Sequence, residues 1–167
     1  MELEVRRIRP EDAETLAALR RKALEAHPLA FGASIEDDHV LSPDFMPSLA
    51  QTEDSVVFGV FVDGSLGGMV GVHRGRHVKA RHTAHVWGMY VSARFRCRGA
   101  GAALLRAAIE HARAWSGVVQ VELAVSDAAP AARRLYDRAG FREWGREPRA
   151  LSWQGRTVDE AHLVLEL

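Results

Sequence analysis

The feature that most constrains the fold lies in the middle of the chain, where a β-rich run, a glycine-containing loop and a helical pattern follow one another. Residues 85–91 (HVWGMYV) are rich in β-branched and aromatic side chains, which is typical of a strand. From Leu104 to Trp115 apolar residues recur at helical spacing, and residues 119–125 alternate as a second strand. This order predicts two parallel strands that are joined by a crossover helix.

The loop before this helix reads RFRCRGAGAALL, from Arg94 to Leu105. A helix start offers up to about four unpaired N–H groups and about half a positive charge, and glycine lets a ligand come close to the backbone. This arrangement favours binding of a pyrophosphate. The candidate binding residues are Arg96, Cys97, Arg98, Gly99, Ala100, Gly101 and Ala102, of which the two arginines are also candidate phosphate partners through their side chains. The alternative is a solvated loop in a chain whose basic residues are nearly all arginine.

The other segments predict an α+β fold with a mixed, mostly antiparallel sheet that is flanked by helices. A strand at residues 2–8 precedes a helix that begins near Pro10 with an acidic first turn, and strand runs at 56–62 and 66–73 flank a tight turn. The remaining expected segments are a loop-rich stretch at 27–51 with a short helix after Pro43, a short helix at 130–139, and two strands within 144–167 around Gln154-Gly155. Since neither a repeat nor a linker interrupts the pattern, we expect one domain over residues 1–167.

Composition narrows the classes of function. The 22 basic and 22 acidic residues give a formal net charge of zero, so the chain as a whole does not favour nucleic acid or an anionic membrane as a partner. An arginine-rich RNA-binding domain is the rival, and it would show salt-dependent binding. Cys97 is the lone cysteine, which argues against a disulfide or a multi-cysteine zinc site and predicts a cytoplasmic protein without a metal. No apolar run approaches the roughly 20 residues of a membrane span, and the N-terminus does not resemble a signal peptide.

Two nucleotide-binding motifs do not fit the loop. A dinucleotide fingerprint counted from Gly99 requires Gly or Ala where Leu104 stands, and the Gly-Lys-Ser or Gly-Lys-Thr of a P-loop does not occur. The loop does match the pattern R-x-x-G-x-G, from Arg96 to Gly101. With RRLYDRAGF downstream at residues 133–141, the stretch MYVSARFRCRGAGAALL resembles the GNAT superfamily of acetyl-CoA-dependent N-acetyltransferases. The predicted order of elements agrees with this family along nearly the whole chain.

The resemblance implies a GNAT-type fold with acetyl-CoA as cosubstrate. The loop would hold the CoA pyrophosphate, and the pantetheine arm would lie like an extra strand along Met89, Tyr90 and Val91, where the two parallel strands separate. One difference concerns the start of the helix after the second parallel strand, where family members often carry an Asn. Here the sequence reads Asp127-Ala128-Ala129-Pro130, so Asp127 or a backbone group replaces the hydrogen bond of that Asn to CoA, or the bond is missing.

Acetyl transfer needs a neutral amine, whereas an alkyl ammonium with a pKa of about 10.4 is almost fully protonated at pH 7. His85 is the candidate general base, because an unperturbed pKa of about 6.5 suits this task and its strand position resembles that of bases in the family. Strand alternation predicts that His85, Trp87, Met89 and Val91 share one side. Tyr136 matches the tyrosine that serves as general acid in the family. For both candidates, the alternative is a packing role.

The resulting expectation is an enzyme that transfers the acetyl group of acetyl-CoA directly to a primary amine in a ternary complex. Small molecules and protein or peptide amines are both open as acceptors. By resemblance, the carboxylates at 36–38 and 159–160 border the acceptor site, where they attract a cationic amine or are simply solvated. The alternative function is a non-catalytic module that binds or senses an acyl-CoA. The exposed edges of a small mixed sheet are compatible with a homodimer.

Overall fold

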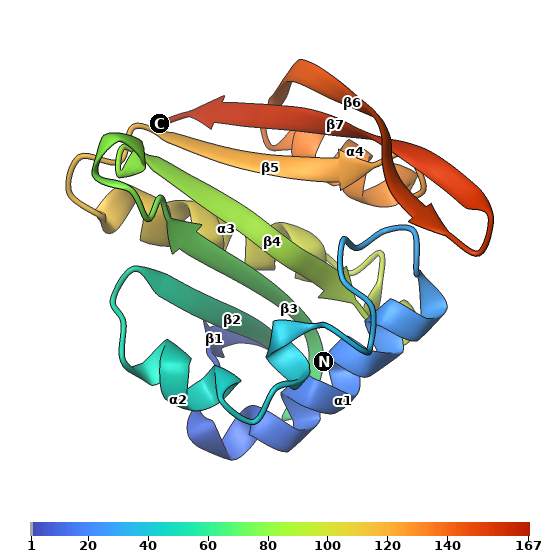
Figure 1. Cartoon of the computed structure of the whole chain (residues 1–167). Coiled ribbons are helices and arrows are strands. Elements are labelled where there is room, and N and C mark those ends of the chain that lie inside the picture. The colour runs from blue at the N-terminus through green and yellow to red at the C-terminus, as the bar shows by residue number, and fades with distance from the viewer. Residues whose placement is uncertain (1) are drawn as a thin grey trace.

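The computed structural model describes residues 2–167, which form a seven-stranded sheet with the order β1-β2-β3-β4-β5-β7-β6 (Figure 1). The strands are β1 (Leu3–Arg7), β2 (Ser55–Val62), β3 (Ser65–Arg74), β4 (Thr83–Val91), β5 (Gln120–Ser126), β6 (Arg142–Trp153) and β7 (Arg156–Glu166). The helices are α1 (Ala13–Ala26), α2 (Phe45–Ala50), α3 (Ala100–Ala114) and α4 (Pro130–Arg138). Among the strand pairs of this sheet, β4 and β5 are parallel and the others are antiparallel. The predicted fold class and the crossover through α3 are therefore confirmed.

Two hairpin turns follow directly from local sequence. Asp63 and Gly64 join β2 to β3 with φ values of 48° and 79°, and Gln154 and Gly155 join β6 to β7 with φ values of 49° and 77°. Two-residue hairpin turns favour positive φ at both positions because their twist then matches that of the strands. Both turns stand where the sequence predicts them.

The helices cover the two faces of the sheet separately. In Figure 1, α1 and α2 lie in front of the sheet, whereas α3 and α4 lie behind it. Leu16 and Leu19 of α1 pack with Met69 of β3 in one buried cluster, while Leu104 of α3 packs with Val70 of β3 in the other. Successive residues of β3 thus serve opposite faces, as the strand pleat requires. Among residues 2–167, no helix has the length and apolar character needed to cross a membrane.

Candidate functional site

The parallel strands β4 and β5 pair along only part of their length. The paired residues are Thr83 with Gln120, Ala84 with Val121, and His85 with Glu122. Beyond these pairs, β4 continues to Val91 without β5 as a neighbour. The Ser92 N–H donates to the Gly67 carbonyl on the β3 side (2.9 Å), so alternation turns the N–H and C=O of Val91 toward the opening between β4 and β5.

A bulge in β4 overturns one sequence expectation. Trp87 pairs with Gly71 and Tyr90 pairs with Met69, so Gly88 and Met89 together stand opposite a single residue of β3. Gly88 has a φ of 65°, which a side chain would disfavour. Because the bulge shifts the alternation by one residue, Met89 packs in the cluster behind the sheet and Trp87 packs in the cluster in front.

His85, Trp87, Met89 and Val91 therefore do not share one side of the strand. The first two belong to the face of α1 and α2, whereas Met89 and Val91 belong to the face of α3. The prediction from simple alternation was wrong because it assumed a regular strand.

The first turn of α3, which follows the loop from β4, has backbone N–H groups without a partner within the helix. Cys97 and Gly99 have φ values of 59° and 80°, and α3 begins at Ala100. The first N–H that bonds back within the helix is that of Ala103, which donates to the Gly99 carbonyl (2.9 Å). The N–H groups of Ala100, Gly101 and Ala102 lie in the first turn and so have no partner within the helix. Cys97 and Arg98 are exposed.

Gly101 brings three elements together. A Cβ at this position would lie 3.4 Å from Leu135 Cδ2 of α4 and 3.9 Å from Val91 Cγ2 of β4. The start of α3, the end of β4 and the helix that carries Tyr136 therefore meet at one point, beside the opening between β4 and β5.

The side chain of Arg96 contacts β4 and the residue that follows α1. Its Nε donates to the Val91 carbonyl (2.9 Å), its Nη2 lies 3.1 Å from His27 Nε2, and its guanidinium lies over the Tyr90 ring. The backbone N–H of Arg96 donates to the Ala93 carbonyl (3.3 Å), so both phosphate-binding groups predicted for Arg96 are engaged within the chain, and the side chain braces the end of β4.

Local chemistry explains the segment around Tyr136. Phe141 N–H and Gly140 N–H donate to the carbonyls of Tyr136 and Asp137, both at 3.1 Å, and Gly140 has a φ of 95°. These bonds form a Schellman motif, and the Tyr136 and Phe141 rings supply its apolar contact with centroids 5.9 Å apart. The side chain of Tyr136 is buried, which raises the pKa of its hydroxyl above the ordinary value. A hydroxyl in this state keeps its proton at physiological pH.

His85 stands at the last paired position before β4 and β5 separate. Burial lowers its pKa below the ordinary value, the nearby His73 lowers it further, and Glu122 acts in the opposite direction. The imidazole is therefore held neutral at pH 7 and can accept a proton.

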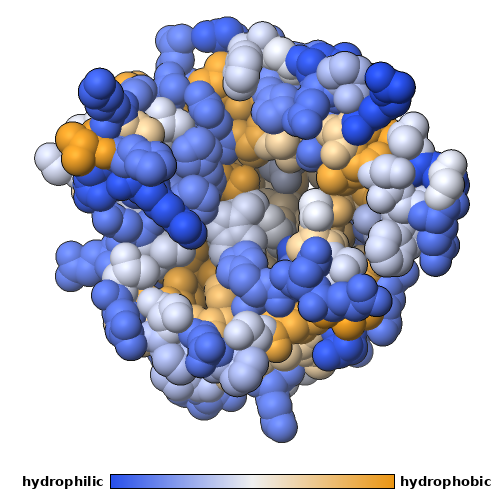
Figure 2. All heavy atoms as spheres, viewed as in Figure 1, coloured by the Kyte–Doolittle hydropathy of each residue, from blue (hydrophilic) through white to orange (hydrophobic). Residues whose placement is uncertain are grey.

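A cleft of about 790 Å³ opens on the face of α1 and α2. Figure 2 shows this face hollowed near its centre, with hydrophobic surface inside and hydrophilic atoms around the rim. Trp87 and Gly88 of the bulge form part of its wall, together with His39, Arg20 and Glu160. Burial raises the pKa of Glu160, and Glu147 adds to this effect.

The comparisons with known proteins identify the family. A family model described as the acetyltransferase (GNAT) family matches residues 16–141. The chain belongs to the GNAT family. No curated protein matches the chain in sequence.

Solved structures of GNAT proteins show the same fold. A GNAT acetyltransferase from Streptococcus pneumoniae is 26% identical, with a TM-score of 0.84 over 99% of this chain and 100% of that chain. A Salmonella typhimurium protein solved with its cofactor acetyl-CoA is 19% identical, with a TM-score of 0.86 over 100% of this chain and 95% of that one. A ribosomal-protein-alanine N-acetyltransferase from Brucella melitensis is 21% identical, with a TM-score of 0.84 over 98% and 99% of the two chains. The family and the neighbour with acetyl-CoA support an acyl-CoA as cosubstrate.

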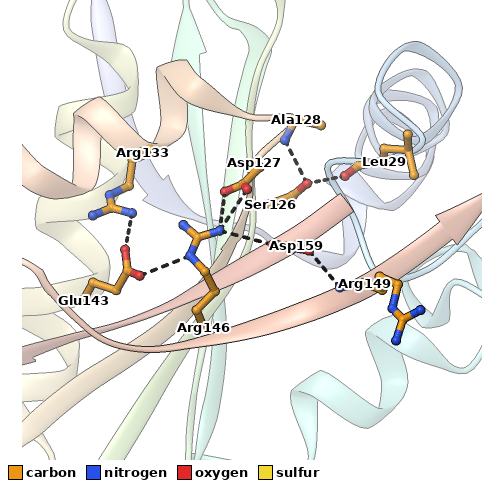
Figure 3. A network of polar contacts seen from close by, with 9 residues as sticks. All are labelled: Leu29, Ser126, Asp127, Ala128, Arg133, Glu143, Arg146, Arg149 and Asp159. Carbon is orange, nitrogen blue, oxygen red and sulfur yellow. Dashed lines mark hydrogen bonds and ion pairs between the residues drawn. The ribbon is translucent and has the colours of Figure 1, made fainter. Parts of the chain in front are cut away.

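An ion-pair network surrounds Asp127, the residue considered as a replacement for the Asn that the family resemblance implies (Figure 3). Ala129, which has no side chain able to cap, stands at the N-cap of α4. Asp127 is held by Arg146 at 2.8 and 3.1 Å, and Arg146 also lies 3.4 Å from Glu143. The Asp127 carboxylate is thus committed to fastening β6 to the loop after β5, and the Asp127 N–H donates to the Asp159 carbonyl (3.0 Å).

Most of the acidic residues proposed near the acceptor are also committed. Asp37 accepts from Ser34, and Asp38 accepts from Arg20. Asp159 accepts from the Arg149 N–H at 2.8 Å.

Sequence reasoning missed Arg20, which is buried and lines the cleft. A signal was present, since Arg20 stands four residues after Leu16 on the apolar stripe of α1, where a charged residue requires a buried partner. It missed His39 as well, whose ring lies 4.8 Å from that of Trp87 between centroids. Sequence spacing could not predict this contact, because His39 and Trp87 of β4 are far apart along the chain.

Proposed function

We propose that the protein transfers the acetyl group of acetyl-CoA directly to a primary amine. The observation that carries this proposal is the separation of β4 from β5 beyond His85, because it leaves β4 without a neighbouring strand along an opening that ends at the start of α3. An extended thioester arm fits such an edge as an additional strand would. In this proposal Met89, Tyr90 and Val91 line the arm.

The loop residues bind the pyrophosphate in this proposal. The backbone N–H groups of the first turn of α3 point out of the helix start, and the helix dipole favours an anion there. The fit rests on a small residue at Gly101, because even a Cβ there would contact Leu135 at 3.4 Å and Val91 at 3.9 Å. The binding residues are Arg96, Cys97, Arg98, Gly99, Ala100, Gly101 and Ala102.

Two side chains move protons. Acetyl-CoA supplies an activated acetyl thioester, whose carbonyl carbon forms the new bond to the amine nitrogen as the bond to sulfur breaks. His85, held neutral by burial, accepts the proton that the amine nitrogen loses, directly or through a water molecule. Tyr136, whose hydroxyl stays protonated, donates a proton to the sulfur of the leaving group. The products are an N-acetylated amine and free CoA.

Calorimetric titration of acetyl-CoA, compared with 3′-dephospho-CoA and NAD, tests the binding half of the proposal. A thiol-release assay across classes of amine then tests transfer. Binding of acetyl-CoA with thiol release on addition of an amine is the expected result. Binding without release for every class of amine would instead favour a module that binds or senses an acyl-CoA, and absence of binding would refute both.

A further inference from the structure

One buried cation in the cleft is incompletely satisfied. Arg20 is 4% exposed, and its Nε and Nη2 donate to Asp38 Oδ2 at 3.0 and 2.7 Å. Its Nη1 is also buried, but within residues 2–167 it meets no hydrogen-bond acceptor. A buried N–H without an acceptor is unfavourable, and charged donors are the most costly to leave unpaired. A ligand with an oxygen at this point would remove that cost.

The vacant side of Arg20 faces the bulge of β4. A Cβ built on Gly88 would lie 3.5 Å from Arg20 Nη1 and 3.4 Å from Met69 Cε. Gly88 has no side chain to pack against Nη1, and both residues line the cleft. The unpaired N–H therefore lies beside the bulge of Gly88 and Met89, and in the proposed function Met89 lines the thioester arm.

The charges around the cleft favour an anion over a cation. Asp38 is neutralised by Arg20, and Asp54 is neutralised by Arg81 through contacts of 2.9 and 3.1 Å. Arg74 and Arg76 add positive charge to the lining. Glu160 is the acidic residue that remains, and burial raises its pKa.

Aromatic rings enclose the same position. Phe31 lies against the guanidinium of Arg20 at 4.8 Å from its ring centroid, and Trp87 and His39 stand together on the wall of the cleft. These rings limit the access of water to Arg20 and thereby strengthen a charged hydrogen bond formed there. They also provide apolar contacts for a small side chain.

We propose that the acceptor carries a carboxylate, and that Arg20 Nη1 donates to one of its oxygens beside Gly88. The acceptor class is then a small amino acid or a related carboxylated amine, not a polycation. This inference rests on the proposed function, because it names the substrate class of the same site. Arg20 is a residue that sets specificity here, with the ion pair to Asp38 fixing its orientation.

Binding of N-acetylated products tests the inference without requiring turnover. N-acetyl-leucine has a carboxylate where N-acetyl-leucinamide has an amide, and neither has an amine that titrates. Calorimetry on the CoA-saturated protein measures the Kd of each, so a difference between them reports on the carboxylate alone. N-acetyl-methionine and its amide form a second pair. We expect each acid to bind at least tenfold more tightly than its amide.

Variants connect this preference to Arg20. Arg20→Lys keeps a charge opposite Asp38 but cannot present Nη1, and it should bind acid and amide within about twofold of each other. If Arg20→Lys does not fold, the double variant Arg20→Gln/Asp38→Asn takes its place in the experiment. It removes both buried charges together, so neither is left unpaired in the core. Arg21→Lys is the matched control, since Arg21 is the next residue of α1 and is exposed, and it should keep the wild-type preference.

Equal binding of acid and amide to the wild type would overturn the inference, and so would a preference that survives in Arg20→Lys. Failure of acetyl-CoA to bind would reject the proposed function and not the carboxylate site. The two outcomes are distinguishable, because binding of the acid and of the amide can also be compared on the protein without CoA. Turnover of amino-acid amides but not of amino acids would leave the enzyme standing while rejecting the carboxylate.

Discussion

The imidazole of His85 stacks on that of His73 across β3 and β4, with ring centroids 5.0 Å apart and planes inclined by 27°. Two positive charges so close would repel each other, so His73 opposes a positive charge on His85. Burial acts in the same direction and lowers the pKa of His85. The pair therefore keeps the proposed base neutral.

Replacement of His85 by glutamine should lower kcat about 100-fold, because the amine then loses its proton without a positioned base. The acetyl-CoA Kd should change less than about threefold. In the wild type, the rising limb of kcat/KM against pH should have its midpoint below pH 6.5, since the pKa of His85 is lowered. Steady-state kinetics from pH 5 to 9 measures both effects.

His77→Gln is the matched control, because His77 is exposed and lies outside the sheet. It should behave as the wild type. A His85→Gln enzyme with normal kcat and an unchanged pH profile would show that His85 only packs.

Stability should fall as the pH falls from 7.5 to 5.5. Burial lowers the pKa values of His27, His39, His85 and His111, so below pH 6.5 the unfolded chain binds more protons than the folded chain. The raised pKa of Glu160 has the opposite effect on stability, but Glu160 is one group against four histidines. One unit of depression in one imidazole corresponds to about 1.4 kcal/mol. We expect the free energy of unfolding from urea titration to drop by at least about 1 kcal/mol.

The variant His39→Gln/His85→Gln should show a smaller drop over the same range. Stability that is constant or higher at pH 5.5 than at pH 7.5 would contradict the lowered pKa values.

Gly101→Glu should raise the acetyl-CoA Kd at least about 100-fold, which corresponds to about 2.7 kcal/mol. The carboxylate would stand at the start of α3, where the proposed site requires an anionic ligand, and between Leu135 and Val91. Gly101→Ala should be tolerated, since its Cβ makes only ordinary contacts at 3.4 and 3.9 Å. Calorimetry measures both variants.

Gly145→Glu serves as the control, because a Cβ there would meet no atom within 4 Å. If Gly101→Glu bound acetyl-CoA as tightly as Gly145→Glu does, the proposed pyrophosphate site would be rejected.

Tyr136→Phe should reduce kcat by about 100-fold while the acetyl-CoA Kd changes little. The substitution removes only the hydroxyl, which is the proposed proton donor to the leaving thiolate. Packing against Phe141 is retained, so the free energy of unfolding should change by less than about 1 kcal/mol.

Phe141→Leu provides the opposite case, because it keeps the Tyr136 hydroxyl and removes the aromatic ring that packs against Tyr136. It should cost about 1 kcal/mol of stability and leave turnover near the wild-type rate at low temperature. Equal turnover of Tyr136→Phe and wild type would reduce Tyr136 to a packing residue.

Sequence alone determined the elements that depend on neighbouring residues. The turns at Asp63-Gly64 and Gln154-Gly155 follow from the positive φ values that such hairpins require. The end of α4 just before Gly140 follows from the Schellman motif, whose bonds join residues at most five positions apart. The strand, loop and helix that include Gly99 could likewise be predicted, because each step depends on periodicity or on the chemistry of a helix start.

Only the tertiary structure decided which side chains meet. The bulge at Gly88 depends on the register of β4 against β3, and it moves Met89 to the opposite face from Trp87. The contact of Arg20 with Asp38 depends on how α1 and the segment after it pack over the sheet. Neither alternation nor spacing carries this information, because long-range register and side-chain packing are set by the whole core and not by adjacent residues.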